Sequence, residues 1–547
     1  MDLKEKIIFY FLLIILTASL LTWGITTYYS KTKAIPAYGG EYIEGIVGQP
    51  QHINPVLSLS NNTDDDMSQL IYSSLMKYDE NGNLINDVAD SYEISDDNTL
   101  YTFHLKNNVL WHDGQNLTAQ DIFFTVNLIT DPSYKSPLRY NWQSVETNVT
   151  DDNTITFKIK SPHAGFLNNL TFGILPKHIW DTVEAEKFPL TSLNLEPIGS
   201  GPYKYSSIQK DSKGNIISYK MAVNSAYYGG KPYISKITFN FYSDDDSAVV
   251  AYNKKEIMGI SSLPTDKIST IKNARSTTLH KANLPRYFSV FFNQTKSVPL
   301  GSSEVREALS LATNKQEIID KVLSGNGYPI YAPITKGMLG YSDDIGKKDF
   351  DPEKANKILD DADWKRGDDG VRSKNKTVLE INLTTANWLE LSGTAEMIKL
   401  QWEKVGAKVN VSVLSISDVQ QNYIRTREYD ALLFGQFLGG DSDPYFFWHS
   451  SQTKDPGLNL SLFGKDDTDK LIEQGRIEFD VEKRASIYRE FQEKLAEKVP
   501  AIFLYSPYYI YPVRSSVKGI DNQNLVSPSN RFSLANTWFI KTKRIGK

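Results

Sequence analysis

Two acidic residues that could bind a charged ligand lie close together in the sequence near residue 440. Asp441 and Asp443 follow an apolar run, residues 431–438, and the glycine pair Gly439-Gly440. A strand that ends in glycine lets another backbone approach closely. A carboxylate there can receive an ammonium group through a charge-assisted hydrogen bond worth about 1.5–3 kcal/mol. A competing interpretation is that Asp443 caps a short helix beginning at Pro444, since proline suits a first helical position.

Tryptophan side chains are candidates for the walls of the same site. Trp388 follows a predicted strand, residues 377–383, and ligands of open α/β sheets often bind just beyond strand ends. Trp448 belongs to an aromatic run after the two aspartates, and its ring suits either a binding wall or a core. Aromatic walls beside carboxylates indicate a protein that holds a ligand rather than one that transforms it.

The sequence lacks the patterns of common catalytic and metal centres. It contains no cysteine, only seven histidines and no HExxH motif, which excludes thiol chemistry and leaves little material for a metal site. It has no phosphate-binding loop of the GxxxxGK[ST] type. Ser200 stands between two glycines, but Pro202 would interrupt the helix of a nucleophile elbow. We therefore expect no enzymatic activity, no metal and no cofactor.

Length and charge give broader limits. A chain of 547 residues is too long for one hydrophobic core, so two or three domains are expected. Its formal net charge of -5 offers no electrostatic basis for binding nucleic acid.

Alternating and helical patterns are interleaved along the chain, which predicts an α/β fold. No linker composition marks a domain boundary, so the chain is expected to pass between domains more than once. Residues 101–105, 154–159, 234–242 and 287–292 read as strands, and residues 119–130, 305–312, 352–362, 395–405, 467–477 and 481–497 as helices.

An uncharged apolar stretch, residues 7–29, lies near the N-terminus. As a helix it spans roughly 35 Å, enough to cross a hydrocarbon core of about 30 Å. Lysines flank both ends, and Trp23, Tyr28 and Tyr29 lie where an interfacial aromatic belt is expected. The stretch is consistent with an uncleaved membrane anchor or a cleaved signal. Either one places the rest of the chain outside the cytoplasm.

Several motifs, in order, resemble the extracytoplasmic solute-binding proteins of ABC importers, of the peptide/nickel-binding type. The most recognisable is Trp-His-Asp-Gly at 111–114, followed by Leu-Thr-Ala-Gln-Asp at 117–121. The other matching segments are 74–78, 197–204, 292–293, 305–309, 351–355 and 439–452. Together they cover nearly all of the chain after the apolar stretch.

The resemblance implies a type II periplasmic-binding-protein-like fold with two lobes, an extra subdomain and one preceding transmembrane helix. Lobe I would combine residues 38–57, 190–283 and 505–547, and the extra subdomain would take residues 58–189. Lobe II would be residues 284–504, leaving residues 1–37 as anchor or signal and tether. Ligand would be enclosed by hinge closure.

The resemblance also implies a ligand and partners. In peptide-binding relatives an aspartate of the Asp-Pro segment pairs with the peptide amino group, four residues before the proline. That position is Gly440 here, and Asp441 is the nearest acid. Main-chain contacts to an added peptide strand would fall at 436–440, including Gln436 and Phe437, and at 47–51, including Gly48 and Gln49. We expect a monomer, held at the cell surface or in the periplasm, that delivers peptides to a membrane permease.

Other functions stay open at this point. The same scaffold could bind a glycan, an opine or a chelated metal. A membrane-tethered hydrolase would use Asp441 and Asp443 as its acid/base pair. A surface sensor or adhesion module would keep the fold without transport.

Overall fold

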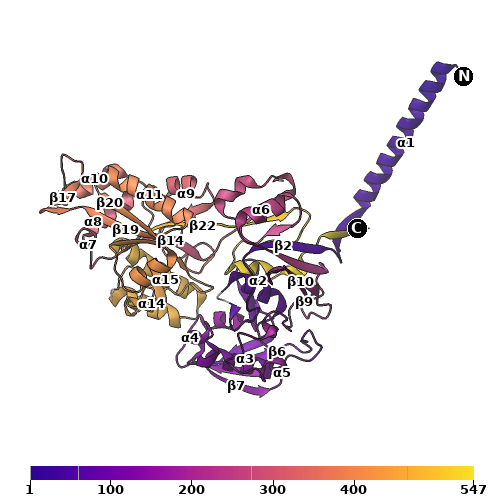
Figure 1. Cartoon of the computed structure of the whole chain (residues 1–547), viewed down its shortest axis with the longest axis horizontal. Helices are drawn as coiled ribbons and strands as arrows, with labels where there is room; N and C mark the ends of the chain where they lie inside the picture. Colours follow the sequence, from indigo (N-terminus) through magenta and orange to yellow (C-terminus); the bar gives the residue numbers. More distant parts are fainter. Residues whose placement is uncertain (1, 59–60, 273, 465) are drawn as a thin grey trace.

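The protein consists of two bodies, each built around its own mixed β-sheet, with a long helix projecting from one of them (Figure 1). The computed structural model describes residues 2–58, 61–272, 274–464 and 466–547. Two large buried clusters of apolar side chains occupy the two bodies separately. The predicted α/β class is confirmed. We keep the names lobe I, extra subdomain and lobe II for the parts described next.

Lobe I is formed by a seven-stranded sheet with parallel and antiparallel neighbours. Helices α2 (Asn62–Ile71) and α6 (Asp245–Asn253) contact this sheet. In sheet order the strands are β13 (Thr277–Ala282), β23 (Tyr509–Arg514), β12 (Gly259–Ile260), β2 (Glu41–Val47), β11 (Lys236–Tyr242), β10 (Ile216–Val223) and β9 (Tyr203–Lys210).

The extra subdomain is an antiparallel four-stranded sheet beside helix α3 (Ala119–Thr130), and its apolar residues continue the core of lobe I. A small hairpin of β3 (Met76–Tyr78) and β4 (Leu84–Asn86) precedes it. Its other elements are β5 (Ala89–Ile94), β6 (Leu100–Leu105), β8 (Thr154–Lys158), β7 (Glu146–Asp151), α4 (Arg139–Trp142) and α5 (Lys177–Trp180).

Lobe II is built on a six-stranded sheet. In sheet order its strands are β15 (Gly327–Pro329), β22 (Ala501–Pro507), β14 (Arg286–Phe292), β21 (Ala431–Phe437), β19 (Glu380–Ala386) and β20 (Lys408–Leu414). Its helices are α7 (Val298–Gly301), α8 (Ser303–Leu311), α9 (Lys315–Val322), α10 (Pro352–Asp361), α11 (Leu389–Lys404), α12 (Ile416–Asp418), α13 (Tyr445–Trp448), α14 (Asp466–Ile477) and α15 (Val481–Lys498). A small sheet of β16 (Lys365–Arg366), β17 (Arg372–Lys374) and β18 (Thr377–Val378) lies at its edge.

The chain crosses between the two large sheets twice. Strand β13 of lobe I leads through residues 283–285 into β14 of lobe II, and β22 returns through Tyr508 into β23. Two short adjacent crossings are the connection expected of a hinge. This double passage also explains why no linker shows in the sequence.

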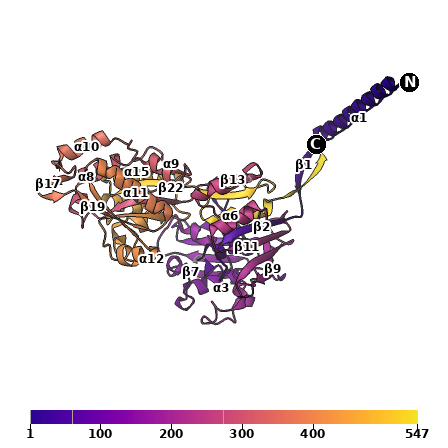
Figure 2. The same ribbon diagram turned by 45° about the horizontal axis from the view of Figure 1, so that its top comes forward.

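Helix α1 (Leu3–Lys31) projects away from lobe I and has no buried residue (Figures 1 and 2). It is the one helix in the described part of the chain that is long and apolar enough to cross a membrane, with a window of mean hydropathy 2.2. At its end the chain continues into β1 (Thr32–Ala37), which pairs antiparallel with β24 (Lys541–Gly546). The C-terminal segment therefore lies at the base of α1.

Candidate ligand-binding site

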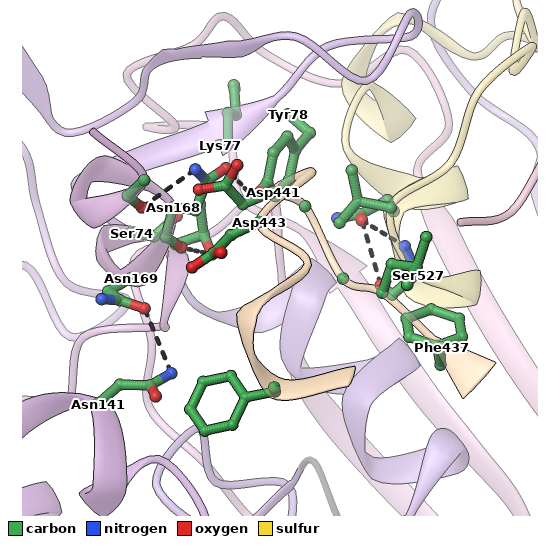
Figure 3. A pocket seen from close by; sticks show the side chains of 18 of the residues that line it. Ser74, Lys77, Tyr78, Asn141, Asn168, Asn169, Phe437, Asp441, Asp443 and Ser527 are labelled. Atoms are coloured by element: carbon green, nitrogen blue, oxygen red, sulfur yellow. Dashed lines mark hydrogen bonds between the residues drawn. The ribbon is translucent and has the colours of Figure 1, made fainter. Parts of the chain in front are cut away.

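A cavity of about 550 Å³ lies between the lobes, beside the loop that follows β21. Lobe II contributes Phe437 at the end of β21 and residues 438–441 and 443 of that loop. The extra subdomain faces it with Tyr78, Asn141 and Asn168. Lobe I adds Asp65 of α2 and residues 526–527 and 529–530. Figure 3 shows Asp441 and Asp443 beside Tyr78 and Asn168, with Ser527 across the cavity. Of the residues singled out in the sequence, Phe437, Gly439, Gly440, Asp441 and Asp443 line this space.

Asp441 is held by an arginine of its own lobe. Nη2 of Arg484, on α15, lies 2.8 Å from Oδ1 and 3.0 Å from Oδ2 of Asp441. Both side chains are largely buried, at 10% and 17% exposure. Asp441 and Tyr488 raise the pKa of the Arg484 guanidinium despite burial. A ligand ammonium at Asp441 would therefore share the carboxylate with Arg484.

Asp443 performs two structural tasks. Its Oδ1 accepts a hydrogen bond from the N–H of Tyr445, 3.0 Å away, the first residue of α13. The capping interpretation is wrong in its position, because Pro444 is the N-cap rather than the first helical residue and Asp443 lies one residue before it. Its Oδ2 lies 3.0 Å from Nε of Arg476 and 3.9 Å from Nε2 of His163. Burial raises the pKa of Asp443 to about 6, against the lowering effect of Arg476. Burial, and then Arg476, lower the pKa of His163.

The extra subdomain touches lobe II at this end of the cavity. The N–H of Ala164 donates to the carbonyl of Arg476 at 2.7 Å. Gly165 lies against Asp441 so closely that a Cβ there would be 1.7 Å from Oδ2. Gly440 packs in the same way against the Tyr78 hydroxyl, which would be 1.9 Å from an added Cβ. The absence of side chains at Gly165 and Gly440 therefore permits the lobes to meet here.

Asp65 is a cleft acid that sequence reasoning did not single out. It lines the main cavity, and its Oδ2 accepts a hydrogen bond from Ser529 at 2.6 Å. Within the described residues no lysine or arginine forms an ion pair with Asp65, whereas its neighbour Asp66 is paired with Arg531. Burial raises the pKa of Asp65 to about 6. A run of three aspartates gave no sign of which one would face a cleft.

A smaller polar recess of about 190 Å³ continues the cavity into the junction of lobe I with the extra subdomain. It shares Asp65, Gln69, Asn168 and Asn169 with the main cavity. The hydroxyls of Ser68 and Ser73, which line it, are buried and have no hydrogen-bond partner in the part of the chain described. Unsatisfied buried hydroxyls are costly, so this recess suits a polar group from a ligand.

Trp388 lies in a different cavity between the lobes, of about 530 Å³. Its side chain is 45% exposed and precedes α11. Tyr508 and Tyr509 of the returning crossing add aromatic surface. Arg286 also lines this cavity, and its Nε is buried without a hydrogen-bond partner among the described residues. Burial lowers the pKa of Arg286.

One residue pair of the lobe II sheet has a member in each cavity. Arg286 of β14 and Phe437 of β21 are direct partners in the antiparallel ladder. Directly opposite residues project to the same face of a sheet. Phe437 lines the cavity with the aspartates and Arg286 lines the cavity with Trp388. The two side chains therefore lie on one face of the lobe II sheet, each at a different cavity.

The family of the chain follows from comparison with known proteins. Residues 83–457 match the family model described as "Bacterial extracellular solute-binding proteins, family 5 Middle". The chain belongs to this family. The resemblance seen in the sequence motifs is confirmed.

Individual relatives of this solute-binding family match along most of their length. The oligopeptide-binding protein AppA of Bacillus subtilis (strain 168) is 28% identical over 489 residues, covering 87% of this chain and 88% of the relative. The dipeptide-binding protein of Escherichia coli (strain K12) is 28% identical over 497 residues. The match covers 86% of this chain and 90% of the relative.

Solved structures of related proteins have the same overall fold as this chain. The structure of AppA from Bacillus subtilis in complex with a nonapeptide has a TM-score of 0.72 at 26% identity, covering 93% of this chain and all of that one. The ABC transporter substrate-binding protein CtaP of Listeria monocytogenes has a TM-score of 0.79 at 26% identity. The match covers 92% of this chain and 99% of the CtaP chain. The predicted two-lobed binding-protein fold, type II, is confirmed.

Four of the residues predicted for the site lie outside both cavities. Trp448 is fully buried against Phe291 and Phe503. Gln436 is buried and bonds to the Tyr287 hydroxyl and the Leu458 carbonyl. Gly48 and Gln49 lie just beyond β2; the Gln49 carbonyl accepts from Asn61. The positive φ of Gly48, 117°, suits glycine. A ligand role for these four stays a prediction.

Proposed function

We propose that this member of the solute-binding family captures peptides between its lobes and delivers them to an ABC permease. The observation that carries the proposal is a pair of cavities between the lobes. One is lined by the Asp65 carboxylate and the other by the Arg286 guanidinium, and neither group forms an ion pair with another described residue. A peptide is the common solute with an ammonium at one end, a carboxylate at the other and main-chain hydrogen-bonding groups between. The family's relatives named for oligopeptides and dipeptides support the same ligand class.

The acidic end would receive the peptide amino group. Asp65 forms no ion pair with a basic residue in the described ranges. Asp441 lines the same cavity and is paired with Arg484. An ammonium placed between them gains a charge-assisted hydrogen bond without removing Arg484. The raised pKa of Asp65 indicates a carboxylate whose charge is poorly compensated before ligand arrives.

The basic end would receive the peptide carboxylate. Arg286 shares its cavity with Tyr505, Tyr509 and Trp388, and no described residue forms an ion pair with it. Glu390 lines the same cavity, and its charge favours the protonated guanidinium against the effect of burial. A guanidinium binds a carboxylate through two parallel hydrogen bonds, and such pairs are strong in a dry setting. Trp388, expected from the sequence to be a wall, would flank this end.

The free edge of β21 would bind the peptide backbone. Strand β19 pairs with β21 only at residues 431–433, so Gly435, Gln436 and Phe437 continue beyond that pairing. An exposed edge offers a row of N–H and carbonyl groups to an added strand. Main-chain bonds give affinity without demanding one side-chain sequence.

Closure about the double crossing would trap the ligand, and the complex would then dock on the permease. Helix α1, left uncleaved, would hold the protein at the outer face of the cytoplasmic membrane. We expect a monomer that performs no chemistry on its ligand.

The proposal is tested by native mass spectrometry followed by calorimetry. Protein purified without added ligand is expected to carry a mixed set of short peptides. Peptides with free termini are expected to bind, and their C-terminal amides to bind about tenfold more weakly. Arg286→Gln should abolish that difference, whereas Arg489→Gln, an exposed arginine on α15, should preserve it. A glycan or opine as the retained ligand, with no peptide binding, contradicts the proposal.

A further inference from the structure

The end of α1 is fastened by the C-terminal strand. Arg544 of β24 donates from Nη2 to the carbonyl of Thr32 at 2.8 Å and to that of Tyr29 at 3.2 Å. Its guanidinium also lies 4.2 Å from the centre of the Tyr29 ring. The N–H of Lys547 donates to the carbonyl of Lys31 at 2.9 Å. The last carbonyls of a helix lack partners within it and carry partial negative charge, so Arg544 both caps the helix and neutralises its end.

The segment built on this junction is strongly basic. We call residues 31–37 and 541–547, which include β1 and β24, the basic ribbon. It contains six lysines and arginines and no acidic residue. None of the six forms an ion pair with a carboxylate in the part of the chain that is described. The whole chain has a net charge of -5, so the rest of the protein carries -11.

The charges share one face of the ribbon. In the β1–β24 register, Lys33 is opposite Ile545, Ile35 is opposite Lys543, and Ala37 is opposite Lys541. Opposite residues project to the same side, so lysines and isoleucines alternate across a single face. These lysines and Ile545 are exposed. Exposed isoleucine between lysines, on a two-stranded ribbon with no covering element, suits a boundary between water and lipid.

The basic ribbon lies at the end of α1, and this position indicates what the ribbon contacts. It begins at the residue where α1 ends (Figure 2). Tyr28 and Tyr29, near that end of the helix, are 53% and 56% exposed. A spanning helix would hold these rings at the level of the phospholipid headgroups. Lys31, Lys33, Arg544 and Lys547 are then within a side chain's length or a Debye length of that layer.

We propose that the basic ribbon binds the anionic headgroups of the outer membrane leaflet and so fixes lobe I at the bilayer surface. The inference rests on the proposed function only in requiring that α1 remains attached and spans the membrane. The acidic remainder of the protein is repelled by the same anionic surface, so attraction is confined to the ribbon. The C-terminal strand thus becomes part of the membrane-binding surface although it is more than 500 residues from the anchor in sequence.

The test uses the absence of natural cysteine in the full-length chain. A fluorophore is attached at Ile545→Cys or, separately, at Gly24→Cys, where an added side chain meets open space. Each protein is placed in nanodiscs that contain a headgroup-linked quencher. One set of nanodiscs is phosphatidylcholine, and the other includes phosphatidylglycerol.

Quenching at residue 545 is expected to be about twofold or more stronger in the anionic nanodiscs and to return to the phosphatidylcholine level in high salt. Replacing Lys541, Lys543 and Lys547 by Gln should remove the gain. Replacing Lys204, Lys210 and Lys213 of the exposed β9–β10 hairpin by Gln removes the same amount of positive charge. This control variant should keep the stronger quenching at residue 545 in anionic nanodiscs.

Two results would overturn the inference in different ways. Equal quenching at residue 545 in both lipids, with residue 24 quenched inside the bilayer, shows an inserted anchor whose ribbon does not bind anionic lipid. Residue 24 unquenched by either lipid shows that α1 does not span, which removes the anchoring premise and leaves the peptide-binding proposal untouched.

Discussion

Arg286 and Phe437 are opposite each other on β14 and β21, and each lines a different cavity between the lobes. Asp65 lines the same cavity as Phe437, and Arg286 lines the other one. Because both residues belong to the sheet of lobe II, the spacing between their side chains is set by the strand ladder rather than by a loop.

Gly165→Ala is expected to disfavour the contact between the extra subdomain and lobe II. Gly165 has a φ of -82°, which alanine adopts freely, so the effect comes from the new Cβ against Asp441. Overpacking of this kind costs about 1–3 kcal/mol. Small-angle scattering should show a larger radius of gyration, and ligand affinity should fall. Gly301→Ala, whose Cβ would have its nearest neighbour at 3.5 Å, is the matched control; an equal loss there would contradict the explanation.

Peptide affinity is expected to rise with pH between about pH 5 and about pH 7. Asp65 and Asp443 have pKa values raised to about 6 by burial. Their raised values mean that the folded protein loses stability as these groups ionise with rising pH. A ligand ammonium binds the ionised form, so affinity at about pH 5 should be roughly tenfold lower if one carboxylate must lose its proton.

Titration calorimetry at several pH values measures this dependence. An N-acetylated peptide, which has no ammonium, should bind with little pH dependence. Asp65→Asn should flatten the profile for the free peptide. A profile that stays steep in this variant would assign the effect to Asp443 instead.

Arg531→Met is expected to destabilise lobe I severely. Arg531 is 1% exposed and donates to Glu44 at 2.8 Å and to both oxygens of Asp66 at 2.6 Å. Removing the guanidinium leaves two buried carboxylates without their cation, a loss of about 3–5 kcal/mol. Urea unfolding measures the change. The double variant with Asp66→Asn should recover part of it, and Arg489→Met should behave like the wild type.

Arg544→Ala is expected to loosen the end of the β1–β24 pair that adjoins α1. The variant removes the bonds to the Tyr29 and Thr32 carbonyls, each worth about 1 kcal/mol or somewhat more. Hydrogen exchange of the β1 amides should accelerate about fivefold to tenfold. Lys543→Ala, on the other face of β24, should change exchange little; similar acceleration in both variants would show that Arg544 has no special role.

Local structure was largely predictable from the sequence because its signals are local. The helix expected at 119–130 is found at those residues, since Thr118 and Asp121 form a capping box. Helix α10 begins at Pro352 after the Asp351 cap, as expected. The strand expected at 287–292 begins one residue earlier, at Arg286. Periodicity and caps therefore fixed these elements without knowledge of their neighbours.

The residues that make up the candidate site were harder to predict from the sequence. The loop with Asp441 could be recognised by its glycines and proline, but its pairing with Arg484, 43 residues later, depends on how α15 packs. Nothing near Asp65 or Arg286 in sequence distinguishes them from other surface charges. The role proposed for them depends on the two crossings, which bring segments of both lobes to the cavities that they line. Trp388 was noticed for its place after a strand, and the same reasoning could not tell which cavity it would join.

The attachment of α1 through β1 to the sheet of lobe I makes the two halves mechanically unequal. With that helix inserted in a bilayer, lobe I is the stationary half, and opening or closing changes only the height and tilt of the distal half. A permease waiting at the membrane would then distinguish loaded from empty protein by where lobe II comes to rest.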